Sequence, residues 1–158
     1  KEWTARGVWG TKTLVDYFKE NVARTPDAVA LADPPNREAL TGIKAERLTF
    51  REFDRAVDAT AEALIRKGIR KDDIIMVQLP NTWELAMLYL AITRAGALIS
   101  PMPMAWRRSE AEYILGMTEA KYGDPWNRSI RSRLAGVRSA SATTPSLRLA
   151  RRSDTAAV

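Results

Sequence analysis

Apolar residues recur at helical spacing near the start of the chain, in the stretch TKTLVDYFKENVART. This spacing predicts a helix that Thr11 or Thr13 caps and that ends before Pro26. The next apolar run, Ala28 to Ala32, is typical of a short strand. Residues 33–46 mix Pro, Asn, Gly and charge, which favours a loop or a hairpin. The apolar positions of the predicted helix are Leu14, Val15, Phe18 and Val22.

A longer helix is predicted from Phe50 onward. Thr49 and Glu52 have the spacing of a capping box, in which each side chain accepts a hydrogen bond from the other residue's backbone. Cationic residues followed by Gly68 are typical of a helix end. The positions expected to face the core are Phe53, Val57, Ala61, Leu64 and Ile65.

An unbroken apolar run from Ile74 to Leu79 is typical of a parallel strand that is covered on both faces. Thr82 is expected to cap the following helix, which closes at Ala95 and Gly96. The stretch ALIS then predicts a second buried strand that ends at Pro101. The positions expected on the inner face of this helix are Leu85, Leu88, Tyr89 and Ile92.

A second capping box, formed by Ser109 and Glu112, predicts one more short helix with Tyr113, Ile114 and Met117. Two successive strand-helix-strand units with short connections imply right-handed crossovers. The expected fold class is therefore α/β, as part of a doubly wound layer of βαβ units.

The positive charge of the chain lies almost entirely in its last segment. Residues 1–122 hold 18 Lys and Arg against 17 Asp and Glu, whereas residues 123–158 hold 7 against 2. Arg, Ser, Ala and Thr supply 22 of those last 36 residues, without apolar periodicity, so this tail is expected to be disordered. A solvated extension, a nucleic-acid contact and translation in a wrong reading frame all fit its composition.

The composition excludes several kinds of chemistry. Neither Cys nor His occurs, which rules out disulfides, thiolate or imidazole metal ligands and nucleophiles that depend on His. The most apolar stretch, residues 85–104, contains Arg94 and two prolines, so no transmembrane helix is expected. The first ten residues lack the apolar run of a signal peptide, and a cytoplasmic location is expected. Lys1 in place of Met is expected either if an upstream segment is missing or if the chain is processed.

Candidate catalytic or binding residues are few. No Gly-rich phosphate loop is present, and Gly10 in GTKT is expected to lie in a turn. Asp72 and Asp73 could be imagined as a pair for acid-base work or Mg²⁺, but adjacent residues that begin a strand point to opposite faces, which favours a turn. Glu110 and Glu112 belong to a helix start, where negative charge is favourable.

The aromatic residues offer one cluster of interest. Trp83, Tyr89, Trp106 and Tyr113 could stack on bases, but Tyr89 and Tyr113 fall on apolar helix positions and are expected in the core. Trp106 adjoins Arg107 and Arg108, so it is expected either to anchor a loop by packing or to meet a ligand or partner domain.

Three motifs in order, LTFREF, QLPN and ITRAGALISPMPM, resemble the N-terminal region of AMP-forming acyl-CoA synthetases, members of the adenylate-forming superfamily. The resemblance covers about residues 11–121. Phe50 stands where that family usually has Tyr, and Asp72 where it often has Gly.

The resemblance implies activation of a fatty or other carboxylic acid in two steps. The acid first reacts with ATP to give an acyl-adenylate, and the acyl group then passes to the thiol of CoA, with Mg²⁺ as cofactor. The family's phosphate loop, metal-binding acid, ribose-binding Asp and catalytic Lys lie downstream of the matched region. We therefore expect no catalytic, cofactor-binding or metal residue in this chain.

These expectations divide the chain into an N-terminal extension (1–10), a partial synthetase domain (11–122) and a tail (123–158). The tail is expected to be either the product of a shifted reading frame or an original downstream fusion. Three functions are compatible with this division: a synthetase fragment that is inactive alone, a module whose basic tail binds nucleic acid or an acidic partner, and half of a split ligase. An isolated half-domain should expose apolar surface and aggregate.

Overall fold

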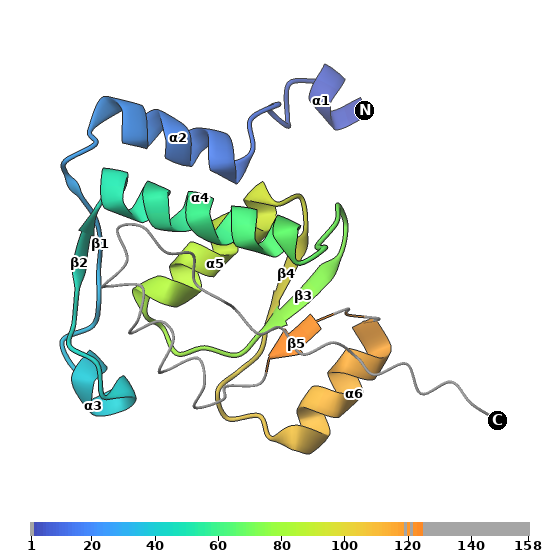
Figure 1. The fold of residues 1–158 in the computed structure, drawn as a ribbon. Helices are drawn as coiled ribbons and strands as arrows, with labels where there is room; N and C mark the ends of the chain where they lie inside the picture. Colours follow the sequence, from blue (N-terminus) through green and yellow to red (C-terminus); the bar gives the residue numbers. More distant parts are fainter. Residues whose placement is uncertain (1, 119, 121, 125–158) are drawn as a thin grey trace.

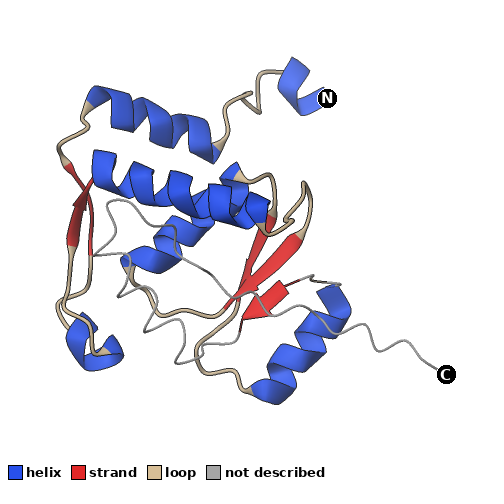
Figure 2. Ribbon diagram, in the orientation of Figure 1, coloured by secondary structure: helices blue, strands red, loops and turns tan. Residues whose placement is uncertain are grey.

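The computed structural model describes residues 2–118, 120 and 122–124 (Figure 1). Helices and strands alternate along the chain, and Figure 2 shows helices on both sides of a small sheet. The elements in chain order are α1 (Glu2–Ala5), α2 (Leu14–Arg24), β1 (Val29–Ala32), α3 (Arg37–Thr41), β2 (Arg47–Thr49), α4 (Phe50–Arg66), β3 (Ile74–Val77), α5 (Trp83–Arg94), β4 (Leu98–Pro101), α6 (Arg108–Thr118) and β5 (Tyr122–Asp124).

Within the described part of the chain, the main sheet has three parallel strands in the order β4-β3-β5. Ile74 pairs with Leu98 on one side of β3, and Ile75 pairs with Tyr122 on the other. The chain thus runs from β3 through α5 to β4, then crosses through α6 to the far side of β3. This change of direction is the mark of a doubly wound sheet, so the predicted α/β fold class is confirmed.

Alternation along β3 separates two cores. Ile75 and Val77 point toward α4 and α5, where they join the larger cluster of buried residues. Met76 points the other way and packs with Ala111 of α6 in a smaller cluster. Because successive side chains of a strand face opposite sides of its sheet, α5 and α6 must cover opposite faces.

The capping boxes of α2 and α4 are formed as the sequence indicates. Thr13 and Asp16 exchange hydrogen bonds at the start of α2, so Thr13 rather than Thr11 is the cap. Thr49 and Glu52 do the same for α4, which begins at Phe50. Phe18 of α2 then packs against the larger core and fixes α2 on α4.

The segment 33–46 contains more structure than the sequence predicts. Strands β1 and β2 pair antiparallel, which confirms the hairpin alternative, but α3 lies inside the connection. Gly42 ends α3 with φ +74, a backbone conformation that side chains other than glycine rarely adopt. The five-residue helix is too short for its periodicity to be visible in sequence.

Several predicted helix details are wrong. Ile65 is 50% exposed, because α4 turns this position away from the core near its last turn. Thr82 occupies the N-cap position of α5, as expected, but its side chain makes no capping hydrogen bond. The box of Ser109 and Glu112 is not formed, because α6 begins at Arg108.

Strand β5 continues the sheet through Asp124, two residues beyond the domain boundary expected at residue 122. The predicted disorder of the tail concerns residues that, from 125 onward, lie outside the described part of the chain.

Candidate functional site

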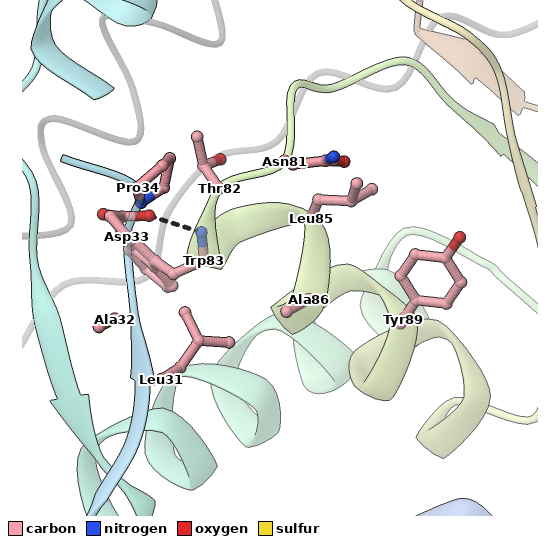
Figure 3. A pocket seen from close by; sticks show the side chains of 10 residues that line it. All are labelled: Leu31, Ala32, Asp33, Pro34, Asn81, Thr82, Trp83, Leu85, Ala86 and Tyr89. Carbon is pink, nitrogen blue, oxygen red and sulfur yellow. Dashed lines mark hydrogen bonds between the residues drawn. The ribbon is translucent and has the colours of Figure 1, made fainter. Parts of the chain in front are cut away.

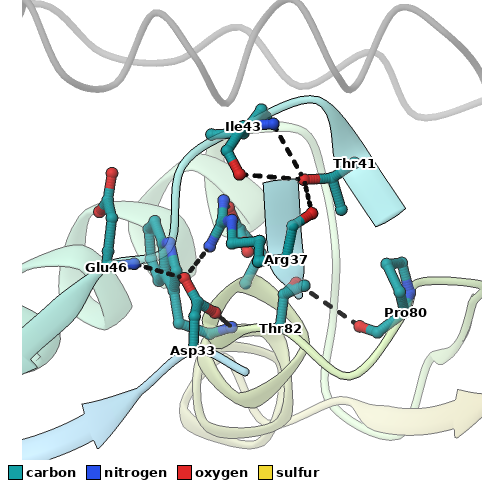
Figure 4. A network of polar contacts seen from close by, with 9 residues as sticks. Asp33, Arg37, Thr41, Ile43, Glu46, Pro80 and Thr82 are labelled. Carbon is teal, nitrogen blue, oxygen red and sulfur yellow. Dashed lines mark hydrogen bonds and ion pairs between the residues drawn. The ribbon is translucent and has the colours of Figure 1, made fainter. Parts of the chain in front are cut away.

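A buried carboxylate joins segments that are distant in sequence. The Oδ1 atom of Asp33, just after β1, accepts a hydrogen bond from the backbone N–H of Trp83 at 2.9 Å. Its Oδ2 atom accepts from the N–H of Glu46 at 3.0 Å and from the guanidinium of Arg37 (Figure 4). Asp33 therefore supplies from a distance the cap of α5 that Thr82 was expected to provide.

Arg37 lies between two carboxylates, those of Asp33 and Glu84, and these three residues form what we call the buried ion network. All three side chains are buried: Arg37 is 2% exposed, Asp33 is 0% exposed and Glu84 is 6% exposed. Burial alone would lower the pKa of the Arg37 guanidinium, but its hydrogen bonds to Glu84 and Asp33 outweigh burial and raise the pKa above its ordinary value. The guanidinium therefore stays charged.

Two atoms of this network have no hydrogen-bond partner among the described residues, the Nε of Arg37 and the Oε2 of Glu84. Both atoms are closed off from solvent, so neither can reach a ligand on the surface. The three side chains bind one another, and Asp33 also binds the backbone at the start of α5. We therefore assign the network a structural role, in which it holds α3 and β1 against the start of α5, and not a catalytic one.

A groove with a volume of about 320 Å³ lies beside the network, between the end of β1 and the first half of α5 (Figure 3). Among the described residues that line it, Asp33 is the only charged one, and its side chain is fully buried. The exposed lining is thus uncharged and suits an apolar group. The lining residues are Leu31, Ala32, Asp33, Pro34, Asn81, Thr82, Trp83, Leu85, Ala86 and Tyr89.

Asp72 and Asp73 lie in the turn before β3, as predicted. Asp72 has φ 66, and its N–H donates to the carbonyl oxygen of Gly96 at 2.9 Å. The Oδ2 of Asp73, a buried residue, accepts from the N–H of Arg70 at 2.8 Å. The Oδ2 of Asp72 accepts from Nζ of Lys71 at 3.0 Å, so the two carboxylates have different partners in the turn. Neither belongs to a group of three or more possible metal ligands among the described residues.

Glu110 stabilises the start of α6, also as predicted. Its carboxylate accepts from the N–H of Arg107 at 2.9 Å. Backbone hydrogen bonds from Glu110 itself and from Arg107 lower the pKa of this carboxyl below its ordinary value. Across the described residues, no group of three or more His, Cys, Asp and Glu could hold a metal ion.

The aromatic predictions are only partly confirmed. Tyr89 and Tyr113 are 37% and 68% exposed, so the expectation that both are core residues is wrong. Trp106 is half-buried and packs against the smaller core. Its carbonyl oxygen accepts from Nε2 of Gln78 at 3.0 Å, which ties the loop after β4 to the end of β3 and confirms the packing role.

The sequence contains no Gly-rich phosphate loop, since its eight glycines are scattered singly. The start of α5 already binds the carboxylate of Asp33. None of the helices formed by residues 2–118 has the length and apolarity that crossing a membrane requires.

The doubly wound sheet and its paired helices place the protein in a broad class of α/β domains, and comparison with known proteins narrows that class. Residues 18–123 match the family described as AMP-binding enzyme, and the chain belongs to this family. It is 32% identical over 116 residues to the medium-chain fatty-acid–CoA ligase of Escherichia coli. It is 34% identical over 96 residues to the salicyl-AMP ligase / salicyl-S-ArCP synthetase of Mycobacterium tuberculosis.

Solved structures agree with this assignment. The apo structure of MbtA from Mycobacterium smegmatis matches 77% of this chain and 21% of its own, with 28% identity and a TM-score of 0.63. The N-terminal subdomain of NpsA from Klebsiella oxytoca matches 77% of this chain with a TM-score of 0.62, and its 23% identity shows the fold alone.

The matched region is a small part of these relatives. The alignments cover 73% of this chain but 19% of the E. coli ligase, and 61% of this chain but 16% of the M. tuberculosis enzyme. The chain therefore spans less than a fifth of the length of each.

Proposed function

We propose that residues 11–122 form the N-terminal scaffold of an enzyme that activates a carboxylic acid as its acyl-adenylate and passes the acyl group to CoA. The observation that carries this proposal is the family match over residues 18–123. The names of the relatives support it, because one is a fatty-acid–CoA ligase and another a salicyl-AMP ligase. A fatty acid is the preferred substrate in this proposal, since the E. coli relative aligns over the larger share of the chain.

The proposed reaction has two steps. A carboxylate oxygen of the acid attacks the α-phosphorus of ATP, and pyrophosphate leaves with the electron pair of the broken P–O bond. The sulfur of CoA then attacks the acyl carbon, the thiol proton is lost, and AMP leaves as the thioester forms. In this proposal the groups that bind ATP and Mg²⁺ lie on other segments of the enzyme, and we assign none of the described residues a part in these steps.

The proposed role of this chain is to support the rest of the enzyme. The buried ion network fixes the start of α5, and the two cores fix α5 and α6 on opposite faces of the sheet. A rigid scaffold of this kind lets catalytic groups on other segments keep their geometry.

A chimera tests the proposal. Residues 11–122 replace the aligned segment of the E. coli ligase, and AMP release is measured with ATP, Mg²⁺, CoA and either octanoate or salicylate. We expect AMP release by the chimera, with octanoate preferred, and none by the 158-residue chain alone. A chimera that unfolds cooperatively yet releases no AMP would contradict the proposal, as would turnover by the chain alone.

A further inference from the structure

The turn between α4 and β3 is rich in positive charge. Four of the six residues 66–71 are cationic, and we call this segment the cationic turn. The first and the last of these four pair with the neighbouring carboxylates of Glu62 and Asp72. Among the described residues, Lys67 and Arg70 form no ion pair. The cationic turn therefore presents two charges that no ion pair offsets.

The core holds this turn in place. Ile69 is 2% exposed and belongs to the larger core, and its N–H donates to the carbonyl oxygen of Leu64 at 3.2 Å. Arg70 follows the buried Ile69 and is exposed, while its N–H donates to the carboxylate of Asp73 at 2.8 Å. The cationic side chains thus project from a backbone that buried contacts fix, so binding a partner there orders little additional chain.

Two aliphatic side chains border the cationic turn. Ile65, which directly precedes it, is 50% exposed. Leu98, the first residue of β4, is 53% exposed, and its N–H donates to the carbonyl oxygen of Asp73 at 2.8 Å. Single exposed aliphatic residues are common on protein surfaces, but aliphatic residues beside unpaired cations suit the interface of an anionic bilayer. There the cations meet the headgroups and the aliphatic groups reach the acyl boundary.

The cationic turn lies at the amino ends of β3 and β4, where α4 ends and the chain returns from α5 to the sheet (Figure 1). Ligands of open parallel sheets bind beyond the carboxyl ends of the strands. A membrane at the cationic turn therefore leaves the ligand-binding edge of such a sheet accessible.

Nucleic acid is the other polyanion that this charge could attract, but the neighbouring residues argue for lipid. None of residues 65–73 is aromatic, so the turn offers no ring for stacking on bases. The exposed Ile65 gains nothing from a phosphate backbone, whereas at the acyl boundary of a bilayer it leaves water.

We infer that the cationic turn, together with Ile65 and Leu98, is a contact surface for a membrane that contains anionic phospholipids. Lys67 and Arg70 bind the phosphates and carboxylates of the headgroups, and Ile65 enters the boundary of the acyl chains. The inference goes beyond the proposed function and does not depend on it, since membrane contact here needs neither ATP nor an acyl substrate.

Sedimentation with lipid vesicles measures the binding of the full 158-residue chain. One set of vesicles contains phosphatidylcholine alone, and the other contains phosphatidylcholine with phosphatidylserine. We expect stronger binding to the second set, and a loss of that binding as the salt concentration rises, because salt screens the attraction between exposed charges.

Charge reversal locates the contact. Lys67→Glu combined with Arg70→Glu should lower the partition coefficient for the anionic vesicles by about ten-fold or more. The matched control is Lys44→Glu combined with Arg55→Glu, since both residues are exposed and the same residue types change in the same way. Arg55 lies about 18 Å along α4 from Lys67. Because that separation exceeds the range of screened charges, the control should change binding by less than about two-fold.

Ile65→Ala tests the apolar part of the contact. We expect its partition coefficient to fall by about three-fold or more, because fewer carbon atoms leave water at the acyl boundary. The dependence of binding on salt should stay the same, since no charge is removed. Circular dichroism checks that each variant is folded. Should Lys67→Glu with Arg70→Glu not fold, Lys67→Gln with Arg70→Gln removes the same two charges and should weaken binding by about three-fold or more.

Three results would overturn the inference. Equal weakening by the two double variants would show that total charge, including that of residues 123–158, attracts the vesicles. Unchanged binding of Ile65→Ala would show that no side chain enters the bilayer. Tighter binding to a single-stranded oligonucleotide than to the anionic vesicles, lost in Lys67→Glu with Arg70→Glu, would assign the cationic turn to nucleic acid instead.

Discussion

Removal of the Asp33 carboxylate is the sharpest test of how the scaffold is held. Asp33→Ala leaves the N–H groups of Trp83 and Glu46 without their acceptor and leaves Arg37 with one of its two counter-charges. A lost helix cap costs about 1 kcal/mol, and each buried donor left unpaired costs about 1–3 kcal/mol. Because Glu84 still pairs with Arg37, we expect a total loss of about 3–5 kcal/mol, within the range for breaking a buried ion pair.

Urea denaturation followed by far-UV circular dichroism measures this loss. The midpoint should fall while the denaturant slope stays unchanged, since the surface exposed on unfolding is the same. Asp27→Ala is the matched control, because Asp27 pairs with Arg51 on the surface and its side chain is 80% exposed. That substitution should change stability by less than about 0.5 kcal/mol. Equal effects of Asp33→Ala and Asp27→Ala would refute the role of the buried ion network.

Three further predictions concern single residues. Thr49→Ala removes the cap of α4 and should lower the free energy of unfolding by about 1 kcal/mol in urea titration, whereas no change would contradict the capping role. Asp72→Gly relieves a positive φ of 66 and should raise the melting temperature, with a gain of about 0.5 kcal/mol after the entropic cost of glycine; a lower melting temperature would contradict it. The backbone N–H of Thr49, and then its hydroxyl, lower the pKa of the Glu52 carboxyl below its ordinary 4.5. Its contribution to stability is therefore complete above pH 4.5 and lost as pH falls through the lower folded value, so Glu52→Gln should flatten the acid side of the curve of urea midpoint against pH.

The elements with strong local signals could be predicted from the sequence. The capping box of Thr49 and Glu52 fixes the start of α4 to the residue, and the apolar run from Ile74 identifies β3 as a covered strand. These features depend on residues only a few positions apart, where spacing determines geometry. The doubly wound class followed because two short strand-helix-strand units leave little choice of topology.

The features that the sequence did not reveal depend on contacts between distant segments. Asp33 caps a helix that begins 50 residues later, and no local spacing could indicate it. The one available signal was Glu84, a charged residue that directly precedes the apolar run 85–92 of α5; once buried, such a charge requires a partner. Tyr89 was assigned to the core because α5 is apolar all round, so its pattern could not tell the covered face from the groove.

Nucleotide binding by the 158-residue chain tests the central claim, that these residues supply the scaffold of an adenylate-forming enzyme and leave nucleotide recognition to other segments. Isothermal titration calorimetry with AMP, and with octanoyl-adenylate, gives the most direct measurement. We expect no saturable binding below about 1 mM, the weakest affinity such a measurement resolves, equivalent to about −4 kcal/mol. A dissociation constant in the micromolar range for either ligand, at one site per chain, would contradict the claim.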